Sequence, residues 1–241
     1  MTQVSPEVAN EKLVGRPPEE VLRWAIETFG SRAALASSFG AEDVVLVDML
    51  ARITDSPRVF AIDTGRLPEE TYDVMERVRK RYGIGIEVYY PQREAVETLG
   101  REAGFYSFRQ SLEARHACCG IRKVEPLQRA LSGLDAWITG LRQEQSVTRT
   151  EIAVVEQDDT NGGIIKVNPL IEWTNEHVWD YIRRHDVPYN RLHDQNFPSI
   201  GCEPCTRAVA AGEHPRAGRW WWESPEDKEC GLHQRGQKTR A

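Results

Sequence analysis

Short apolar strands alternate with amphipathic helices along most of the chain, and this alternation constrains the fold more than any other feature. Four apolar runs are separated by longer segments whose apolar residues recur at helical spacing. Strands are predicted at residues 33–37, 58–62, 86–89 and 136–139, and helices at 19–29, 42–51, 68–81 and 124–131. Because strands joined through helices run parallel, the pattern predicts an α/β fold in which helices cover both faces of a parallel sheet.

The next part of the chain adds a pair of short apolar runs. Residues 152–155 and 164–167 could form a hairpin across the turn residues 161–163, or they could flank a loop of the main sheet. A further helix is predicted at 175–184, with Thr174 as its N-cap.

Beyond residue 188 the pattern becomes irregular and rich in proline, glycine, tryptophan and charge. We therefore expect an α/β domain over residues 1–187 and a loop-rich C-terminal extension over 188–241, packed together as one integrated domain.

Composition and charge exclude several classes of protein. No apolar run approaches the roughly 20 residues that a membrane helix needs, and residues 1–11 lack the layout of a signal peptide. We therefore expect a cytoplasmic protein without a membrane partner. The net charge of −6 argues against a general nucleic-acid binder. An anionic ligand would need a local cluster of basic residues.

The five cysteines form two close pairs and a single thiol. An odd count in a protein expected inside the cell argues against a disulfide framework. Adjacent Cα atoms stand about 3.8 Å apart, while disulfides usually need roughly 4.4 Å or more, so Cys118 and Cys119 are poorly placed to bond. Together with Cys202 and Cys205 they indicate one four-thiolate metal site, although four buried or redox thiols are an alternative. Spacing alone does not separate an iron–sulfur cluster from zinc.

The single thiol is Cys230, which lies in a polar, glycine-containing tail. With no cysteine left to pair with, it is a candidate nucleophile, although a bystander is the simpler interpretation of a lone tail cysteine.

Two loops follow predicted strands at the edge where open α/β sheets bind ligands. In the first, Ser37, Ser38 and Gly40 precede Asp43 at the start of a helix, whose N-terminus favours anions. The second loop consists of Asp63, Thr64 and Gly65. There the carboxylate could accept from a ribose or adenine group, and the glycine permits close approach. Ordinary turns are the alternative for both loops.

Basic residues lie after a strand end or close to the cysteine pairs. They are Arg122, Lys123, Arg142 (which follows Gly140), Arg216 and Arg219. Arginine suits recognition of phosphate or sulfate through two parallel hydrogen bonds, although solvated surface charge is the usual case.

Taken together, the motifs resemble those of the assimilatory adenylyl-sulfate reductases, within the adenosine 5′-phosphosulfate/3′-phosphoadenosine 5′-phosphosulfate reductase family. They are Ser38-Phe39-Gly40-Ala41-Glu42-Asp43, Asp63-Thr64-Gly65, Cys118-Cys119-Gly120-Ile121-Arg122-Lys123, Gly140-Leu141-Arg142, Cys202-x-x-Cys205-Thr206-Arg207 and Glu229-Cys230-Gly231-Leu232-His233. The resemblance runs from about Trp24 to His233. It implies an adenine-nucleotide α-hydrolase-like fold, with the nucleotide-binding domain over residues 1–187 and a mobile catalytic tail in the extension.

The resemblance also implies roles for individual residues. The four paired cysteines would hold a [4Fe-4S] cluster, and Cys230 would be the catalytic nucleophile. The residues Lys123, Arg142, Arg216 and Arg219 would contact the phosphosulfate or its neighbourhood, and the 37–43 loop would line the nucleotide pocket. Thioredoxin or glutaredoxin would donate electrons, in sulfate assimilation for cysteine biosynthesis.

Three alternatives remain open from the sequence, as does homo-oligomerisation. Family members that use the 3′-phosphorylated nucleotide typically lack the four paired cysteines, so a reductase of that nucleotide, or of both, is the first alternative. The second is an ATP pyrophosphatase-type ligase or a tRNA-thiolating enzyme, although Phe39 and Ala41-Glu42 interrupt the usual Ser-Gly-Gly-x-Asp-Ser loop of those enzymes. The third is not an enzyme: it is a zinc-stapled binding module whose basic residues face nucleic acid.

Overall fold

The computed structural model describes residues 4–145 and 152–224. Six strands form one sheet in the order β3-β2-β1-β4-β6-β5. The strands are β1 (Ala33–Ala36), β2 (Val59–Ile62), β3 (Ile86–Tyr89), β4 (Ala136–Ile138), β5 (Val155–Asp158) and β6 (Ile164–Val167). Strand β1 pairs in parallel with β2 and with β4, and β4 pairs in parallel with β6. The edge strand β5 runs antiparallel to β6. The prediction of an α/β fold on a parallel sheet is confirmed.

The chain divides into two compact units. The first, here called the sheet unit, comprises Met1–Ala61, Val74–Glu87 and Gly133–Tyr189. The second, here called the thiol unit, comprises Ile62–Asp73, Val88–Ser132 and Asn190–Ala241. The sequence-based boundary at residue 188 stays a prediction.

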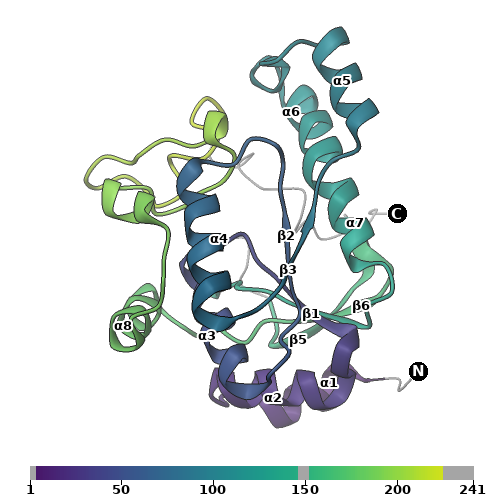
Figure 1. Ribbon diagram of the computed structural model, residues 1–241, viewed down its shortest axis with the longest axis vertical. Helices are drawn as coiled ribbons and strands as arrows, with labels where there is room; N and C mark the ends of the chain where they lie inside the picture. The colour runs from purple at the N-terminus through teal and green to yellow at the C-terminus, as the bar shows by residue number, and fades with distance from the viewer. Residues whose placement is uncertain (1–3, 146–151, 225–241) are drawn as a thin grey trace. The chain divides into compact units, whose positions relative to one another are not determined.

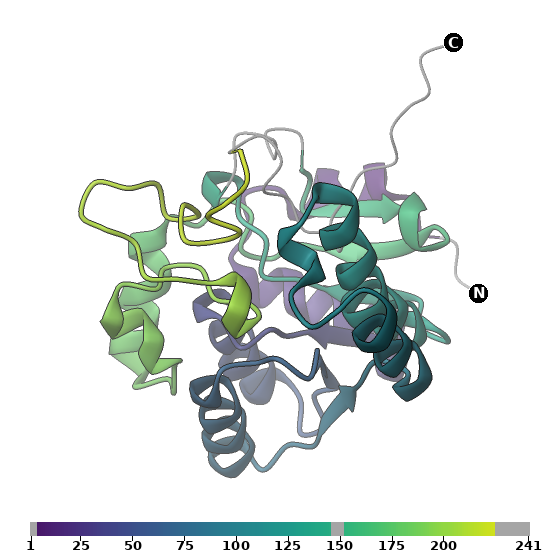
Figure 2. The same cartoon turned by 90° about the horizontal axis from the view of Figure 1, so that it is seen from above.

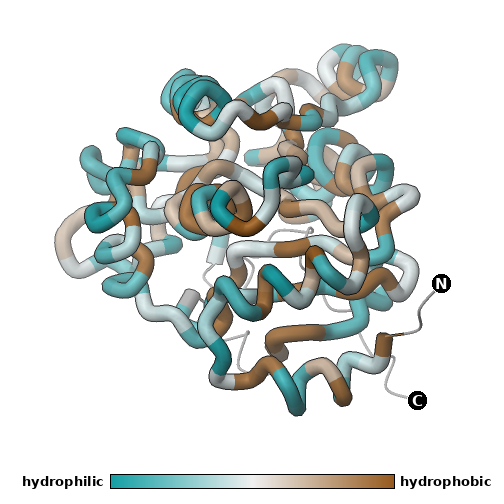
Figure 3. The backbone as a smooth tube through the Cα atoms, turned by 60° about the horizontal axis from the view of Figure 1, so that its bottom comes forward, coloured by the Kyte–Doolittle hydropathy of each residue, from teal (hydrophilic) through white to brown (hydrophobic). Residues whose placement is uncertain are grey.

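Helix α3 (Ala41–Ile53) is the central helix of the sheet unit, where it packs against β1, α2 (Pro18–Phe29) and α8 (Asn175–His185). Its residues are buried without a break from Asp43 to Leu50, as expected of a helix surrounded by other elements. Figure 3 shows hydrophobic and hydrophilic residues alternating along much of the trace. The first helix, α1 (Pro6–Leu13), packs against β5.

One buried carboxylate ties helices of the sheet unit together. Asp48 in α3 accepts hydrogen bonds from the hydroxyls of Tyr82 and Tyr181 and from the guanidinium of Arg52. Tyr82 ends α4 (Glu69–Tyr82), and Tyr181 belongs to α8. Three donors satisfy the buried charge, so this network is structural.

The thiol unit is built from helices and loops. Helices α6 (Leu112–Cys119) and α7 (Glu125–Leu131) are joined by the π-helical turn η3 (Gly120–Val124), and Figure 1 shows them in one line with α5 (Arg93–Glu102) beside them. Pro126 near the start of α7 has no N–H to continue a regular ladder, which suits a helix that is interrupted at this point.

The C-terminal part of the thiol unit consists mainly of loops. Over residues 190–224, Figure 2 shows this yellow-green segment as an irregular trace, in which the helical turns are the short 3₁₀ turns η7 (Arg191–Gln195) and η8 (Glu203–Cys205). One more such turn, η2 (Ser107–Arg109), lies between α5 and α6. In the described part of the chain, no helix is both long and apolar enough to cross a membrane.

Most predicted elements differ from the observed ones by one or two residues. The hairpin is confirmed as β5 and β6, although β5 begins at Val155 rather than residue 152. The predicted N-cap Thr174 accepts a hydrogen bond from the His177 N–H. The sequence did not predict α1, α5 or α6. Helix α5 has only three apolar residues, Ala95, Val96 and Leu99, and none of its residues is buried, so the sequence gives little indication of a packed helix.

Candidate functional sites in the two units

The loop after β1 is locked by its own side chains. The Ser38 N–H and hydroxyl both donate to Oδ2 of Asp43, at 2.6 and 2.8 Å. The Phe39 N–H donates to the Ser37 hydroxyl at 3.1 Å. Phe39 is buried and adopts a left-handed backbone with φ of 58°, a strained conformation for a residue with a side chain. The loop therefore holds a fixed shape at the start of α3, as a preformed binding loop requires.

Asp43 in this loop has a perturbed carboxyl group. Burial disfavours its charged form and raises its pKa to about 6, although hydrogen bonds from Ser38 act in the opposite direction. The neighbouring charge of Glu42 raises the pKa further. A carboxyl group of this kind exchanges its proton near neutral pH, which is common at functional sites.

Gly140 follows β4 and lies close to α3. A Cβ atom here would lie 2.5 Å from Oδ1 of Asp43 and 2.8 Å from the Cβ of Glu42, so only glycine fits. Two residues later, Arg142 is buried and donates to Glu42 at 2.9 Å and to Glu144 at 2.7 Å. Its charge is already balanced by carboxylates, a feature that the sequence did not reveal.

The loop after β2 belongs to the thiol unit and is also internally bonded. Oδ1 of Asp63 accepts from the Gly65 N–H at 2.7 Å, and Oδ2 accepts from the Tyr72 hydroxyl at 2.9 Å. Burial and the hydrogen bond to Asp63 raise the pKa of Tyr72 to about 12. Both carboxylate oxygens predicted to face a nucleotide thus have partners within the protein.

Thr64 connects the same loop to the cysteines. Its hydroxyl lies 3.3 Å from Sγ of Cys202, and its carbonyl accepts from Nη1 of Arg122 at 2.6 Å. The Glu203 N–H donates to the carbonyl of Arg66 at 2.9 Å, which fixes the loop against η8 as well.

Four buried thiols gather in the thiol unit. Cys118 and Cys119 end α6, while Cys202 precedes η8 and Cys205 ends it. All four are buried and free of disulfides. Charge on Cys202 affects the pKa of Cys118 and of Cys205, and charge on Cys119 also affects that of Cys205. The two sequence pairs therefore come together, as the four-thiolate interpretation requires.

Cations surround these thiols. Those that influence them are Arg66, Arg122, Lys123 and Arg219. Burial would raise the pKa of Cys202, but Lys123, the Thr64 hydroxyl and two arginines outweigh it, so that pKa is lowered. Burial instead dominates at Cys118, whose pKa is raised, and at Cys205, where the pKa reaches about 12. This environment favours anionic sulfur at Cys202 above all.

Two of the cations have unused donors. Nε of Arg122 and Nε of Arg219 are buried and have no hydrogen-bond partner. A buried unpaired donor is costly, so both groups fit a site completed by further negative charge. The four thiols and these arginines thus suit an anionic metal–sulfur group or an anionic ligand. Within residues 4–145 and 152–224, no three histidine, cysteine, aspartate or glutamate side chains converge closely enough to hold a single metal ion.

Arg219 also explains a local glycine. Its guanidinium bonds the carbonyl of Ile200 at 3.1 Å, and a Cβ atom on Gly201 would lie 2.2 Å from its Nη2. The sequence predicted Arg219 and Lys123 near the cysteines, and both are there. Arg216 is half-buried in the same loop. Cys230 lies outside the described residues, and Arg66 was not predicted because its sequence context carries no signal.

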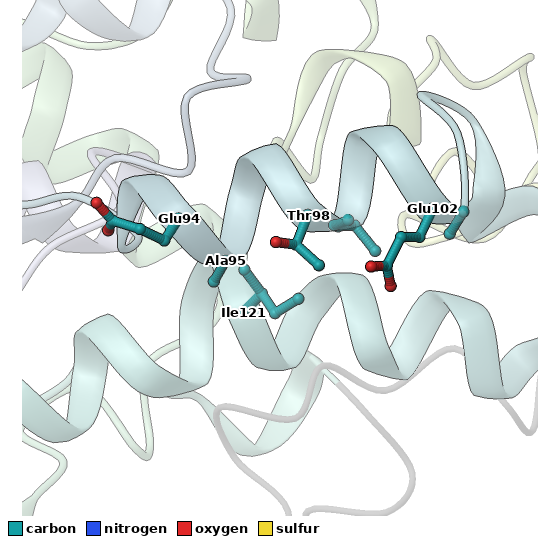
Figure 4. Close-up of a pocket in the computed structure, with 7 residues that line it drawn as sticks. Glu94, Ala95, Thr98, Glu102 and Ile121 are labelled. Atoms are coloured by element: carbon teal, nitrogen blue, oxygen red, sulfur yellow. The ribbon is translucent and has the colours of Figure 1, made fainter.

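A shallow groove of about 460 Å³ runs along one side of α5 (Figure 4). Its lining comes from α5 and the residue after it, together with Ile121 of η3. Leu99 in this lining also packs against the hydrophobic cluster that contains three of the thiols. None of the four thiols lines this groove.

Comparisons with known proteins identify the family of this chain. A family model described as the phosphoadenosine phosphosulfate reductase domain matches residues 32–208. An adenosine 5′-phosphosulfate reductase of Allochromatium vinosum is 54% identical over 200 residues, which cover 83% of this chain and 78% of that protein.

Two solved structures extend the comparison. The crystal structure of a phosphoadenylyl-sulfate reductase from Candida auris, a phosphate complex, is 32% identical with a TM-score of 0.73; the match covers 87% of this chain and 98% of that chain. The FMN adenylyltransferase of Candida glabrata, in complex with FAD and inorganic pyrophosphate, is 14% identical with a TM-score of 0.58, over 100% and 80% of the two chains. At that identity the likeness concerns the fold alone.

Proposed function

This chain belongs to the phosphoadenosine phosphosulfate reductase family, and we propose that it reduces adenosine 5′-phosphosulfate to sulfite and AMP. The observation that carries the proposal is a set of four buried thiols among cations in a chain that is 54% identical to a reductase of that name. We place the reaction in sulfate assimilation for cysteine biosynthesis, in the cytoplasm.

The proposed cofactor is a [4Fe-4S] cluster held by Cys118, Cys119, Cys202 and Cys205. Such clusters are bound by four thiolates. The fit is supported by four buried thiols in one unit and by the unpaired Nε donors of Arg122 and Arg219. When bound, the cluster would tie the end of α6 to η8 and add negative charge among the cations.

In the first half-reaction, the Cys230 thiolate attacks the sulfur of the sulfuryl group. The bond from that sulfur to the bridging phosphate oxygen breaks, and AMP leaves with the electron pair. The enzyme then carries a sulfonate on Cys230. Because an anion attacks a polyanion here, positive charge must offset the repulsion, and Lys123, Arg216 and Arg219 are the residues proposed to supply it.

In the second half-reaction, a thiolate of a dithiol donor attacks Sγ of Cys230 and displaces sulfite. The second donor thiol then resolves the mixed disulfide, which leaves Cys230 reduced and the donor oxidised. Two electrons have passed from the donor to the sulfur atom. We propose thioredoxin or glutaredoxin as the donor.

The proposed nucleotide site is the 37–43 loop together with Gly140 and Arg142. The first N–H groups of a helix have no partner within the helix, so the start of α3 can receive an anion. Because Arg142 is paired with Glu42 and Glu144, we expect it to orient the loop as well as to meet the ligand. The roles of Asp63, Thr64 and Gly65 toward the nucleotide are likewise proposals.

The experiment that tests the function begins with anaerobic purification and counts of iron, sulfide and zinc. We expect four irons and four sulfides per chain, from the cluster type. Sulfite release from adenosine 5′-phosphosulfate with reduced thioredoxin follows. Cys230→Ser should abolish sulfite release while AMP still binds. Normal turnover by that variant would refute the mechanism, and stoichiometric zinc without iron would refute the cluster.

The alternative substrate is the nucleotide that also carries a 3′-phosphate. We consider it because a structural relative at 32% identity is named a phosphoadenylyl-sulfate reductase. The ratio of kcat/KM for the two nucleotides decides between them. We expect the nucleotide without the 3′-phosphate to be preferred, and a ratio that favours the other one would reassign the substrate.

A further inference from the structure

Three of the four thiols share a packed cluster with aromatic rings. Cys118, Cys202 and Cys205 are buried together with Phe108 and Trp220. Phe108 comes from the turn η2 and is only 1% exposed. A metal–sulfur group held by these thiols would therefore border on aromatic carbon as well as on cations. The apolar surroundings of such a group control the access of solvent to it.

The Phe108 ring contacts further rings and two cations. The ring centres of Tyr106 and Trp222 lie 6.0 and 5.9 Å from its own. The guanidinium groups of Arg66 and Arg109 lie 5.1 and 5.6 Å from its centre. Because the face of an aromatic ring attracts a cation, these contacts hold the ring in place beside the thiols.

Arg109 joins η2 to the loop that carries the second cysteine pair. Its Nη2 donates to the carbonyl of Pro204 at 3.0 Å. Pro204 lies between Cys202 and Cys205, within η8. The same guanidinium lies 5.2 to 5.6 Å from the centres of four rings, which are those of Tyr106, Phe108, Trp221 and Trp222. One side chain thus connects the aromatic residues to the backbone between two thiols.

Arg66 makes a second connection between the same segments. Its Nη2 donates to the carbonyl of Phe105 at 2.8 Å. Its own carbonyl accepts from the Glu203 N–H at 2.9 Å, at the start of η8. The segment 105–109 is therefore tied to η8 twice, once through each arginine. We call this segment, together with Arg66, the aromatic clasp.

The clasp separates solvent from the thiols. Phe105 and Tyr106 are 74% and 62% exposed, whereas Phe108 is buried in the thiol cluster. Arg109 is exposed again. The chain thus passes from the surface of the unit to the thiols and back within a few residues. A segment held by side-chain contacts and one short 3₁₀ turn opens more readily than a packed helix or sheet.

We propose that the aromatic clasp closes the four-thiol site against water and small solutes, and that Arg109 keeps it closed. The inference rests on the proposed cofactor, because a metal–sulfur group is what the closure protects. Arg109 touches no reacting atom in this role, so it is a positioning residue. Its bond to Pro204 and its ring contacts belong to the closed form and are lost when the clasp opens, so both favour closure.

The test replaces Arg109 and a matched arginine of the same unit. Arg109→Met removes the charge and the bond to Pro204 and keeps an apolar stem, and no buried charge loses its partner because Arg109 is exposed. The control is Arg129→Met in α7. Arg129 also donates to a backbone carbonyl, that of Tyr90, and lies 6.0 Å from the centre of the Tyr89 ring. The control therefore loses contacts of the same kind outside the clasp.

The quantity measured is the rate at which excess EDTA removes iron from the anaerobic holoprotein, followed through the visible absorbance of the cluster. We expect removal to be about tenfold faster in Arg109→Met, because a bond from a charged donor and several ring contacts no longer favour the closed form. The iron content before EDTA is added should equal that of the wild type. Arg129→Met should lose iron at the wild-type rate.

Two results would overturn the closure. One is a wild-type rate of iron removal in Arg109→Met. The other is an equal acceleration in Arg129→Met, which would mean that the rate follows the general stability of the unit. A wild-type chain without iron would refute the proposed cofactor and the closure with it. An iron-loaded wild type that releases no sulfite would refute the proposed reaction alone, because the closure is measured without turnover.

Discussion

The loops that follow β1 and β2 resemble each other in position and in their small and polar residues, but they lie in different chemical surroundings. Both are short, rich in small residues and placed after a buried strand. The first faces carboxylates: Asp43 is buried beside Glu42, and Arg142 is neutralised by its partners. In the second loop, the hydroxyl of Thr64 contacts the buried thiol of Cys202, and the carbonyl of Thr64 accepts a hydrogen bond from Arg122. Their similarity in sequence therefore says little about what each can bind.

The difference lies in the elements that pack against each loop. In the sheet unit, the turn after β4 brings Gly140 and Arg142 against the start of α3. In the thiol unit, η3 and η8 bring cations and thiols against the second loop. A surplus of positive charge therefore gathers around the thiols, although the chain as a whole carries a net charge of −6.

The largest effect is expected in the thiol unit, where one of the four proposed ligands is replaced. Cys202→Ser removes one of the four proposed ligands, and we expect loss of essentially all bound iron and of sulfite formation, because four thiolates hold such a cluster. Iron analysis of the anaerobically purified chain measures it. Cys230→Ser is the matched control and should retain full iron. Full iron in the Cys202→Ser chain would show that the ligand set is wrong.

The next prediction tests the ion pair between Arg142 and Glu42, beside the loop that follows β1. Arg142→Met leaves Glu42 without its partner in a site where the two side chains are 5% and 17% exposed. Breaking such a pair costs about 3–5 kcal/mol. Urea unfolding of the variant measures this loss. Arg32→Met is the control, because its pair with Asp135 is 49% and 33% exposed and should contribute at most about 1 kcal/mol. Equal losses in both variants would contradict the distinction.

A third prediction concerns the pH dependence of the carboxylate loop. Because the folded-state pKa of Asp43 is raised from 3.8 to about 6, the folded protein binds this proton more tightly than the unfolded chain does. Its effect on stability is therefore most favourable below about pH 4 and worsens as pH rises to about 6. Asp43→Asn removes that dependence and can keep both Ser38 bonds, since both go to one oxygen.

The variant should gain up to about 3 kcal/mol over the wild type at pH 7 and little at pH 4. Urea unfolding at the two pH values measures the difference. A gain of the same size at both would mean that ionisation of Asp43 is not the cause.

The smallest expected effect concerns the loop after β2. Tyr72→Phe removes the donor to Oδ2 of Asp63 and leaves the other oxygen bonded to Gly65. We expect a loss of about 1 kcal/mol in the free energy of unfolding, the usual contribution of one hydrogen bond. Tyr90→Phe, at a residue that is 56% exposed, is the control. A loss in the control as large as that of Tyr72→Phe would exclude the hydrogen bond as the cause.

The periodicity of apolar residues and the spacing of motifs in the sequence predicted much of the fold and part of the candidate sites. The parallel strands were predictable because their apolar runs are continuous. Thr174 was predictable as an N-cap because threonine is one of the residue types preferred at that position. The family resemblance carried by the paired cysteines and loop motifs is confirmed by the matching family model and relatives. Helix α5 was missed because only three of its residues are apolar, and the burial of Trp220 was missed because a run of three tryptophans gives no indication of which one is buried.

The sequence by itself determined the order of the strands and of most helices along the chain, the set of thiols and the family, because these depend on local pattern and residue identity. Only the tertiary structure decided that Arg142 is balanced by Glu42, that Thr64 contacts Cys202, and that Arg115 holds Glu223. Each of these contacts joins residues far apart in the chain. Their partners are chosen by packing and by the need to satisfy buried charge, which no local pattern encodes.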